Sequence, residues 1–448
     1  MNLIPSILKP APPIPEIEDK NIVDELYPYW RIRTLYSIFI GYAFYYFTRK
    51  SFTFAMPGII NELGYDKTQL GLLASIFSVA YGLSKLASGI LSDCSSPRYF
   101  MAMGLFFAGA CNIMFGFSSS LFFFALFWGF NGWFQGFGAP PCIRFLTQWY
   151  SHTERGAWWS TWSTSHNIGA FIIPWIVGAS LHQWGWRYAM YIPGVICIIG
   201  SLFLINRLRD TPQSIGLPPI DKYRNDYSAS LPDQNQPLPF WTIFYLYILK
   251  NKYIWLLAFA YFFIYIVRIG IADWTALFLI EEKGYSLFGA SGSASLFEIG
   301  GMTGGLTAGW ASDRLFGAKR GPVNCLYAIA IIGALFLFKA VPVGYQLFDS
   351  ITIFILGFTV FGPQMLIGVA AAEVTHKNAV ATSNGFIGLG AYLGAAMAGY
   401  PLGKIAHEIG WNGYFWALLA CALIAVIALI PMWNVTKAQT RQELVEGE

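Results

Sequence analysis

Charged residues are scarce in this 448-residue chain. Asp, Glu, Lys and Arg make up 12% of the residues, whereas hydrophobic residues make up 56%. A soluble domain carries about 25% charged residues, so a soluble protein of this composition would lack the polar side chains that cover a surface. Charge is missing altogether from four long stretches, residues 99–143, 156–186, 378–403 and 409–436. Because a membrane helix needs roughly 20 apolar residues, each stretch is long enough to cross a bilayer.

Signals of enzymatic or nucleotide chemistry are also missing. The six cysteines are scattered and no pair has the spacing of a metal site, so we interpret them as small core residues. The sequence has no glycine-rich phosphate loop that ends in Lys-Ser or Lys-Thr, which argues against driving by ATP. A net charge of +4 gives no indication of nucleic-acid binding. We therefore expect no cofactor, no metal, no enzyme activity and no nucleic-acid partner.

The apolar segments predict an all-α membrane protein with twelve transmembrane helices. The N-terminus carries prolines and acids in place of a basic start and an apolar run, so the first membrane helix is expected to act as the insertion signal. A polar, proline-rich insertion separates two groups of six spans. The spans are expected near 34–60, 69–92, 99–117, 121–149, 157–182, 188–206, 252–280, 289–311, 322–341, 348–373, 379–404 and 411–433. The predicted parts are an N-terminal segment (1–33), two six-helix halves (34–206 and 251–433), a linker (207–250) and a tail (434–448).

The distribution of basic residues predicts the orientation. With twelve spans, one set of loops contains twelve Lys and Arg residues and the other set contains five. Loops rich in Lys and Arg stay in the cytoplasm. We therefore expect both termini and the linker to be cytoplasmic.

A short internal repeat relates the two halves. Residues 86–93 (LASGILSD) resemble residues 306–313 (LTAGWASD) at an offset of 220, and each copy ends the second span of its half. Parallel repeats of this kind are a main transporter architecture, with the binding site near the midplane between the halves. The repeat indicates two pseudo-symmetric halves.

Two arginines inside predicted spans follow the same repeat. Arg49 lies in the first span and Arg268 in the seventh, 219 positions apart, which is within one residue of the repeat offset of 220. Charges inside a membrane are costly and usually functional, and the planar fork of arginine suits a phosphate. We therefore predict that the two arginines bind an anion across a central cavity. The alternative is that each arginine snorkels or pairs with a local acid, such as Asp273 or Glu298.

Further polar and aromatic side chains near these arginines are candidate substrate contacts. Lys85 lies one turn after Tyr81, where its side chain lines the cavity or reaches the cytoplasmic interface. His166 and Asn167 belong to a polar stripe on a membrane helix. A lone histidine is often a satisfied core residue, but this stripe favours a cavity-lining role. The predicted tyrosine contacts are Tyr42, Tyr46, Tyr81 and Tyr265.

Charged residues at the cytoplasmic ends of the repeat are candidate gating residues. Asp93 is expected to pair with Arg98 or Arg155, and Asp313 with Arg314 or Arg320, holding an outward-open state. The alternative is that the acids cap helices and that the basic residues only reflect the membrane orientation.

Several motifs together resemble one family. They are residues 41–50 (GYAFYYFTRK), 92–98 (SDCSSPR), 154–156 (ERG), 165–167 (SHN) and 267–271 (VRIGI). The chain from about 30 to 435 resembles the organophosphate:phosphate antiporter family of the major facilitator superfamily. The resemblance implies the major facilitator fold and a location in the inner membrane of a bacterium. It also implies that Arg49 and Arg268 hold the phosphate, while His166, Lys85 and nearby tyrosines line the path.

Within that family, the chain is most similar to the hexose-phosphate branch, including a transporter-like sensor of external glucose 6-phosphate. Residues 149–156 (WYSHTERG), 361–368 (FGPQMLIG) and 391–396 (AYLGAA) carry this similarity. The dedicated hexose-phosphate carriers have an Asp and a Lys in the eleventh span where this chain has Asn384 and Ile387. Sugar recognition at these positions is therefore expected to differ.

These observations predict a secondary antiporter that exchanges a sugar phosphate, most specifically glucose 6-phosphate, for inorganic phosphate. Two alternatives remain open. One is a receptor of the same fold that senses hexose phosphate and signals through a partner kinase. The other is a glycerol-phosphate:phosphate antiporter. The chain is expected to be monomeric in the bilayer.

Overall fold

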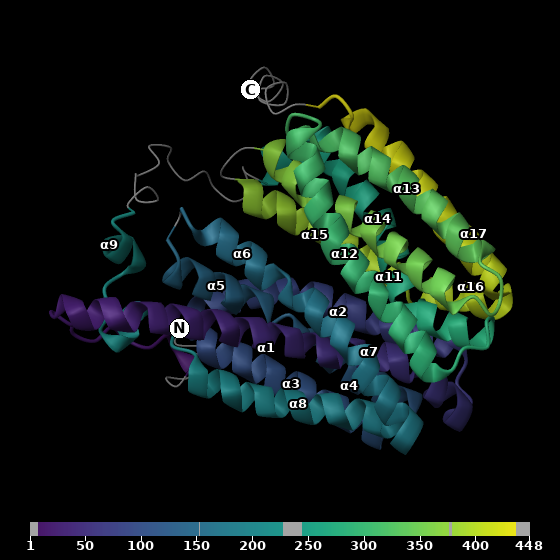
Figure 1. Ribbon diagram of the computed structural model, residues 1–448, viewed down its shortest axis with the longest axis horizontal. Helices are drawn as coiled ribbons and strands as arrows, with labels where there is room; N and C mark the ends of the chain where they lie inside the picture. The colour runs from purple at the N-terminus through teal and green to yellow at the C-terminus, as the bar shows by residue number, and fades with distance from the viewer. Residues whose placement is uncertain (1–7, 152, 227–243, 376–378, 436–448) are drawn as a thin grey trace. The chain divides into compact units, whose positions relative to one another are not determined.

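The computed structural model describes residues 8–151, 153–226, 244–375 and 379–435, which are mostly helical (Figure 1). Its longer helices are α1 (Lys20–Leu63), α2 (Lys67–Cys94), α3 (Pro97–Phe117), α4 (Leu121–Gln135), α5 (Ala139–Trp149), α6 (Arg155–Ser163), α7 (Ser165–Trp184), α8 (Trp186–Arg207), α11 (Lys252–Glu281), α12 (Leu287–Arg314), α13 (Arg320–Ala340), α14 (Gln346–Glu373), α15 (Val380–Met397), α16 (Tyr400–Glu408) and α17 (Gly410–Leu429). The shorter elements are η2 (Pro212–Ile215), α9 (Ile220–Arg224), η3 (Phe244–Leu249) and η5 (Ile430–Met432).

The chain divides into two compact units. Unit 1 comprises residues 1–52 and 80–234, and unit 2 comprises residues 53–79 and 235–448. Residues 53–79 therefore pack with the C-terminal helices, although they precede most of unit 1 in the sequence. Thr53 donates to Asp273 on α11 at 3.2 Å, and the Lys67 ammonium lies 2.6 Å from the Glu281 carboxylate.

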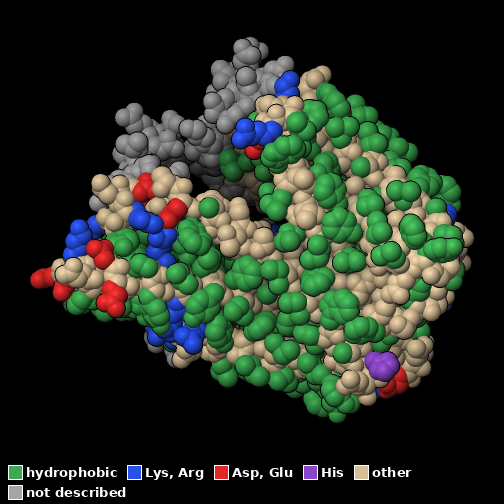
Figure 2. Space-filling model, in the orientation of Figure 1, with side chains coloured by type: hydrophobic (Ala, Val, Ile, Leu, Met, Phe, Trp, Pro, Cys, Tyr) green, Lys and Arg blue, Asp and Glu red, His purple; other side chains and the backbone are tan. Residues whose placement is uncertain are grey.

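Eight helical segments among the described residues are long and apolar enough to cross a membrane. The other four predicted spans fall on α1, on α12 and on the pairs α4–α5 and α6–α7. These helices are interrupted or rich in polar, glycine or tyrosine residues, which weakens their apolar signal. Figure 2 shows hydrophobic side chains spread across the visible helical surface.

Three of the predicted continuous spans are divided in the structure, and proline explains two of the breaks. The segment 157–182 falls on α6 and α7, which are separated at Thr164. The segment 121–149 forms α4 and α5, and α5 begins with Pro140 and Pro141 in its first turn. Without backbone N–H groups, these prolines cannot donate to the preceding turn, so the helix is interrupted there. The segment 379–404 is likewise divided into α15 and α16 before Pro401.

The start of the chain also differs from the expected boundary. Helix α1 begins at Lys20, whereas the first span was expected from residue 34. Its added N-terminal turns are packed rather than isolated, because Tyr27 is fully buried. The Tyr27 hydroxyl donates to the Pro218 carbonyl at 2.7 Å, and its ring stacks on Tyr223 at 3.9 Å. The first part of the predicted linker is thus docked on unit 1.

Glycine permits close contact between two helices of unit 2. A Cβ atom at Gly300 or Gly304 of α12 would overlap the carbonyls of Phe354 and Phe358 on α14. The two backbones therefore touch, as small residues allow in membrane helices. This pairing fixes the part of α14 that carries Phe361, beside Arg268.

Candidate substrate site

Arg49 on α1 is held by a hydrogen bond and two aromatic rings in unit 1. Its Nε donates to Gln135 Oε1 at 3.2 Å. Its guanidinium carbon lies 4.3 Å from the Tyr46 ring centre and 4.4 Å from that of Tyr81. Cation–π contacts at these distances attract the charge to the ring faces. The side chain is half-buried. The predicted residues Arg49, Tyr46 and Tyr81 therefore come together in the structure.

Gln135, at the end of α4, was not predicted as a site residue, yet it orients Arg49. The side chain is fully buried. Its amide nitrogen lies within hydrogen-bond distance of the Tyr45 carbonyl (3.1 Å), Thr48 Oγ1 (3.0 Å) and Asn131 Oδ1 (3.1 Å). These acceptors fix the amide nitrogen, and the oxygen is therefore directed to Arg49 Nε. A buried amide satisfied on both sides has one orientation.

The amide contacts continue deeper into unit 1. Asn131 Nδ2 donates to the Thr48 carbonyl at 3.2 Å and lies 3.4 Å from Asn112 Oδ1. Asn112 in turn donates to the Met190 carbonyl at 2.7 Å and accepts from Ser51 at 3.0 Å. The orientation of Gln135 is thus tied to α3 and α8. The sequence contains a signal for this network. Asn131 and Gln135 are two amides at i, i+4 spacing inside a run without charged residues.

An aromatic wall extends from Arg49 along unit 1. The Tyr46 ring lies 5.6 Å from the imidazole of His166, and the Tyr42 ring lies 5.0 Å from Trp162. His166 is half-buried and the adjacent Asn167 is buried. The structure therefore places Tyr42, Tyr46 and His166 together, as predicted, and adds Trp162. Lys85 lies on α2 with an exposed side chain, so either predicted role of Lys85 stays possible.

Arg268 on α11 lies against aromatic rings in unit 2. Its guanidinium carbon is 5.3 Å from the Tyr265 ring centre and 4.9 Å from that of Phe361. Tyr265 itself lies 4.8 Å from Tyr261 and 6.0 Å from Tyr392. Tyr265 was predicted as a contact, whereas Phe361 is an addition from α14. The rings form an apolar and aromatic cradle for the cation.

The two positions that depart from the hexose-phosphate carriers lie on α15. Asn384 Nδ2 donates to the Val380 carbonyl at 3.2 Å, one turn earlier on the same helix. Ile387 is 1% exposed and belongs to the apolar core of unit 2. An apolar side chain is therefore well suited to position 387 of this chain, where a lysine would need a partner.

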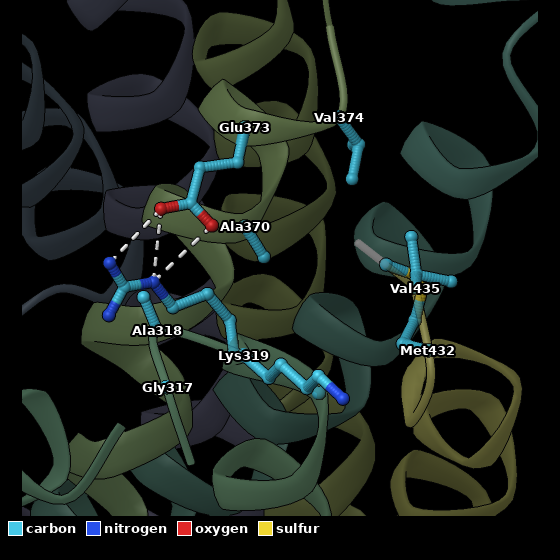
Figure 3. Close-up of a pocket in the computed structure, with 10 residues that line it drawn as sticks. Gly317, Ala318, Lys319, Ala370, Glu373, Val374, Met432 and Val435 are labelled. Carbon is cyan, nitrogen blue, oxygen red and sulfur yellow. Dashed lines mark hydrogen bonds and ion pairs between the residues drawn. The ribbon is translucent and has the colours of Figure 1, made fainter. Parts of the chain in front are cut away.

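The cytoplasmic motif of unit 2 forms an ion-pair network. Arg320 lies 2.5 Å from Asp313 and 3.0 Å from Glu373. Figure 3 shows the Glu373 carboxylate facing this guanidinium, with Lys319 extending away from it. The network borders a cavity of about 380 Å³ at the ends of α14 and α17. Arg314 is exposed. The gating role of these residues remains a prediction.

The corresponding motif of unit 1 uses backbone acceptors. Arg98 Nε donates to the Ile205 carbonyl at 2.7 Å. Arg155 donates to the carbonyls of Thr147 and Tyr150 at 3.2–3.3 Å. The Asp93 side chain lies outside the described residues. The two copies of the motif are therefore stabilised differently in the part that the structure describes.

A further acid–base cluster joins the linker to unit 1. Glu154 forms ion pairs with Arg31 of α1 and, at 3.2 Å, with Arg224 of α9. Burial raises the pKa of Glu154, but the Arg31 hydrogen bond and charge, the Ser151 N–H and Arg224 together lower it below the ordinary value. The carboxylate is therefore the stable form, and it connects the α5–α6 loop to the linker.

Comparison with known proteins identifies the family. The Major Facilitator Superfamily profile matches residues 38–399. A "Probable hexose phosphate transport protein" of Chlamydia trachomatis is 52% identical, covering 99% of both chains. The "Membrane sensor protein UhpC" of Escherichia coli is 44% identical, covering 98% of this chain and 100% of that protein. This chain belongs to the organophosphate:phosphate antiporter family of the major facilitator superfamily.

Solved structures support the same fold. A bacterial homologue of the human lysosomal transporter Spinster, in an inward-facing and occupied conformation, matches with a TM-score of 0.73 at 15% identity. The match covers 93% of this chain and 98% of that one. The prediction of an all-α membrane protein with the major facilitator fold is confirmed, as is the family. Membership of a superfamily of transport proteins also confirms that the chain is a multi-pass membrane protein and not an enzyme.

Proposed function

We propose that this protein is a secondary antiporter that exchanges glucose 6-phosphate for inorganic phosphate by alternating access. The observation that carries the proposal is the setting of Arg49. Its guanidinium is oriented by Gln135 and flanked by Tyr46 and Tyr81 inside a membrane helix bundle. A pre-oriented guanidinium suits a phosphate monoester, which accepts hydrogen bonds from both arms of the fork.

Arg268 supplies the second charge in this proposal. The sequence repeat gives Arg268 the position in the second half that Arg49 has in the first. Two guanidinium groups that share a bound phosphate neutralise its charge. Without an anion, the same two charges repel one another in a low-dielectric cavity. Return of the empty carrier is thus disfavoured, and exchange is faster than net transport.

The ester part of the substrate is assigned from the neighbouring side chains and from the relative's name. Tyr42, Tyr46 and His166 offer hydrogen-bonding groups beside aromatic surface, a combination suited to a sugar ring. The relative from Chlamydia trachomatis is named for hexose phosphate transport. We therefore favour a hexose phosphate over glycerol phosphate. We also propose an inner-membrane location with both termini in the cytoplasm.

The second candidate function is a receptor for the same ligand. It is favoured by the 44% identical Escherichia coli protein, whose name is that of a membrane sensor. A receptor needs a signalling partner, such as a membrane kinase. It binds the ligand with differential affinity for two conformations but does not have to release it on the opposite side.

Phosphate efflux from vesicles tests the proposed substrate. Purified protein in vesicles loaded with labelled inorganic phosphate should release the label when glucose 6-phosphate is added outside. Glucose itself should release none, since it lacks the phosphate that Arg49 is proposed to bind. Efflux with glycerol 3-phosphate but not with glucose 6-phosphate would replace the hexose assignment with the glycerol-phosphate alternative. Equal efflux with buffer and with either ester would contradict exchange.

A further inference from the structure

A cationic cavity lies at one end of unit 1, away from Arg49. It has a volume of about 390 Å³, and its walls come from the N-terminal segment, the start of α3 and the chain after α8. Three of its lining residues are cations and one is an acid: Lys9, Arg98, Arg209 and Asp210. Figure 2 shows blue side chains gathered at this end of unit 1, beside a hydrophobic face. An excess of positive charge in a concave site indicates an anionic ligand.

The single acid of the cavity is already satisfied. Asp210 is 3% exposed. Its two oxygens accept hydrogen bonds from Ser96 Oγ (2.7 Å), from the backbone N–H of Arg98 (3.3 Å) and from the backbone N–H of Ala11 (2.9 Å). These bonds hold the N-terminal segment against the start of α3 and thereby form the cavity. Asp210 therefore acts as a structural anchor, and it balances only part of the surrounding positive charge.

Arg98 and Arg209 donate hydrogen bonds to backbone carbonyls at the end of α8, so both have a structural role. Arg98 Nε donates to the Ile205 carbonyl, and Arg209 Nη1 donates to the carbonyls of Asn206 and Leu208 at 3.1 and 2.7 Å. Cations at a helix C-terminus are favourable. A guanidinium has five N–H groups, however, and these contacts use only Nε of Arg98 and Nη1 of Arg209. Both arginines therefore keep donor groups beyond those that cap the helix.

The cationic side chains also lie close enough together for their positive charges to repel one another. Burial, followed by the charges of Arg98 and Arg33, lowers the pKa of Arg209 below its ordinary value. Arg33 and Arg209 both lie over the Trp30 ring, at 4.5 and 5.4 Å. An anion placed between such cations relieves their repulsion.

Exposed apolar side chains lie on α3 and α8, the two helices that have one end near the cavity. Helices α3 and α8 pack against each other, and Phe106, Phe107, Ile199 and Leu202 are exposed on them. Leu202 is one helical turn before Ile205, the residue whose carbonyl binds Arg98. A phospholipid joins apolar acyl chains to a polar headgroup. An apolar strip next to a cationic cavity therefore suits a lipid with an anionic headgroup.

We propose that this cavity binds the phosphate headgroup of an anionic phospholipid, with the acyl chains lying on the exposed face of α3 and α8. Arg98 and Arg209 are the headgroup ligands, and Tyr99 and the N-terminal segment form the rim. The site tethers the N-terminal segment and the start of the linker to the bilayer surface. A free phosphate would satisfy the same cations but would leave the apolar strip without a role.

Native mass spectrometry of the purified full-length chain tests this site. The protein is titrated with phosphatidylglycerol, with phosphatidylcholine of the same chain length, and with inorganic phosphate. We expect about tenfold or greater preference for phosphatidylglycerol, since basic residues near a membrane surface each favour anionic lipid. Arg98→Gln/Arg209→Gln should remove the preference, whereas Arg209→Lys should keep most of it. Arg187→Gln is the matched control, because Arg187 lies at the other end of α8 and donates to Ser119.

Three results would overturn the proposal. One is equal retention of the two lipids by the wild type. Another is unchanged preference in the double variant. The third is displacement of phosphatidylglycerol by millimolar inorganic phosphate, which would make the cavity a free-anion site. If the double variant does not fold, Arg209→Gln alone must reduce the preference several-fold. The readout does not use transport, so failure of the proposed exchange activity leaves it unaffected.

Discussion

Arg49 and Arg268 occupy equivalent positions of the repeat but have different surroundings. Arg49 is bonded through Nε to a buried amide and flanked by two tyrosines. Arg268 rests against Tyr265 and Phe361. A ring face attracts a guanidinium but does not fix its rotation within the plane of contact, whereas a hydrogen bond through Nε does. The repeat therefore preserves the charge in both halves, and in unit 1 the Gln135 amide sets the direction of the guanidinium.

The difference suggests a division of labour in the proposed site. Unit 1 presents a guanidinium of fixed orientation, so it provides geometric specificity for phosphate. Unit 2 presents its charge beside the rings of Tyr265 and Phe361, so aromatic contacts contribute to holding it. The following predictions test this asymmetry, from the largest expected effect to the smallest.

Replacing either arginine with lysine should have the largest effect. Arg49→Lys and Arg268→Lys keep the charge but remove the bidentate fork, and hydrogen bonds to charged groups contribute about 1.5–3 kcal/mol each. We expect phosphate exchange in vesicles to fall roughly 100-fold or more, with membrane insertion unchanged. Lys404→Arg is the matched control, because Lys404 is an exposed cation that pairs with Glu408 at 3.8 Å. Exchange within a few-fold of wild type in either lysine variant would remove that residue from the phosphate site.

Gln135→Leu should have the next largest effect. Leucine has a similar volume but offers no oxygen to Arg49 Nε, so the guanidinium loses its orientation. We expect about a tenfold rise in the phosphate concentration for half-maximal exchange, consistent with loss of one charged hydrogen bond. Gln135→Glu keeps an oxygen but neutralises Arg49, so it should weaken phosphate binding further. If Gln135 is only structural, both variants should lower the melting temperature and protein yield without a selective change in phosphate affinity.

Phe361→Leu is the corresponding change in unit 2, and its effect should be smaller. It removes one of the two ring faces beside Arg268, and such contacts contribute about 0.5–1 kcal/mol when partly exposed. We expect half-maximal exchange to require about threefold to fivefold more phosphate. An effect equal to that of Gln135→Leu would show that the two units orient their arginines equally strongly.

The proposed gating residues of unit 2 give a further comparison, between the two acids Asp313 and Glu373. Glu373 contacts Arg320 through both carboxylate oxygens and is less exposed than Asp313. Exposed ion pairs contribute little, so Asp313→Asn should change the conformational balance by less than about twofold. Glu373→Gln should shift it toward inward-open by about fivefold. Accessibility of a cysteine placed on the cytoplasmic face measures the shift, and no change in the Glu373 variant would exclude a gating role.

The smallest effect concerns pH and the linker of unit 1. The pKa of Glu154 is lowered in the folded protein, so its ion pairs stabilise the fold above the ordinary carboxyl pKa near 4.5. That contribution is lost as the pH falls through the lowered pKa. The Glu154→Gln variant should therefore melt a few degrees below wild type at pH 7, and the difference should shrink as the pH falls below the ordinary carboxyl pKa. A melting difference that does not vary with pH would assign the effect to packing.

Much of the unit 1 site could be predicted because it is local. Tyr42, Tyr46 and Arg49 are spaced by three or four positions, so one helix places them on neighbouring turns. The charge-free runs and the repeat predicted the fold and the equivalence of the two arginines. A single residue in a membrane segment indicates a functional site when its presence in the bilayer is energetically costly, as that of an arginine is.

Gln135 and Phe361 were missed because their roles depend on packing between distant segments. Gln135 is 86 positions from Arg49, and an uncharged amide in a span has many possible partners. Phe361 is one phenylalanine among 38. The breaks before Pro140 and Pro401 had a visible cause in the sequence, but length and apolarity alone favoured continuous spans. Docking of the linker on unit 1 depends on side-chain contacts such as Tyr27 with Tyr223, which composition does not reveal.

Counterflow tests the central claim of carrier-mediated exchange most directly. Vesicles that contain the purified protein and unlabelled inorganic phosphate are given a trace of labelled glucose 6-phosphate outside. An antiporter should accumulate the label transiently above equilibrium, and Arg49→Lys vesicles should not. If the wild-type protein is folded and binds glucose 6-phosphate but accumulates no label, the exchange mechanism is contradicted and the receptor function takes its place.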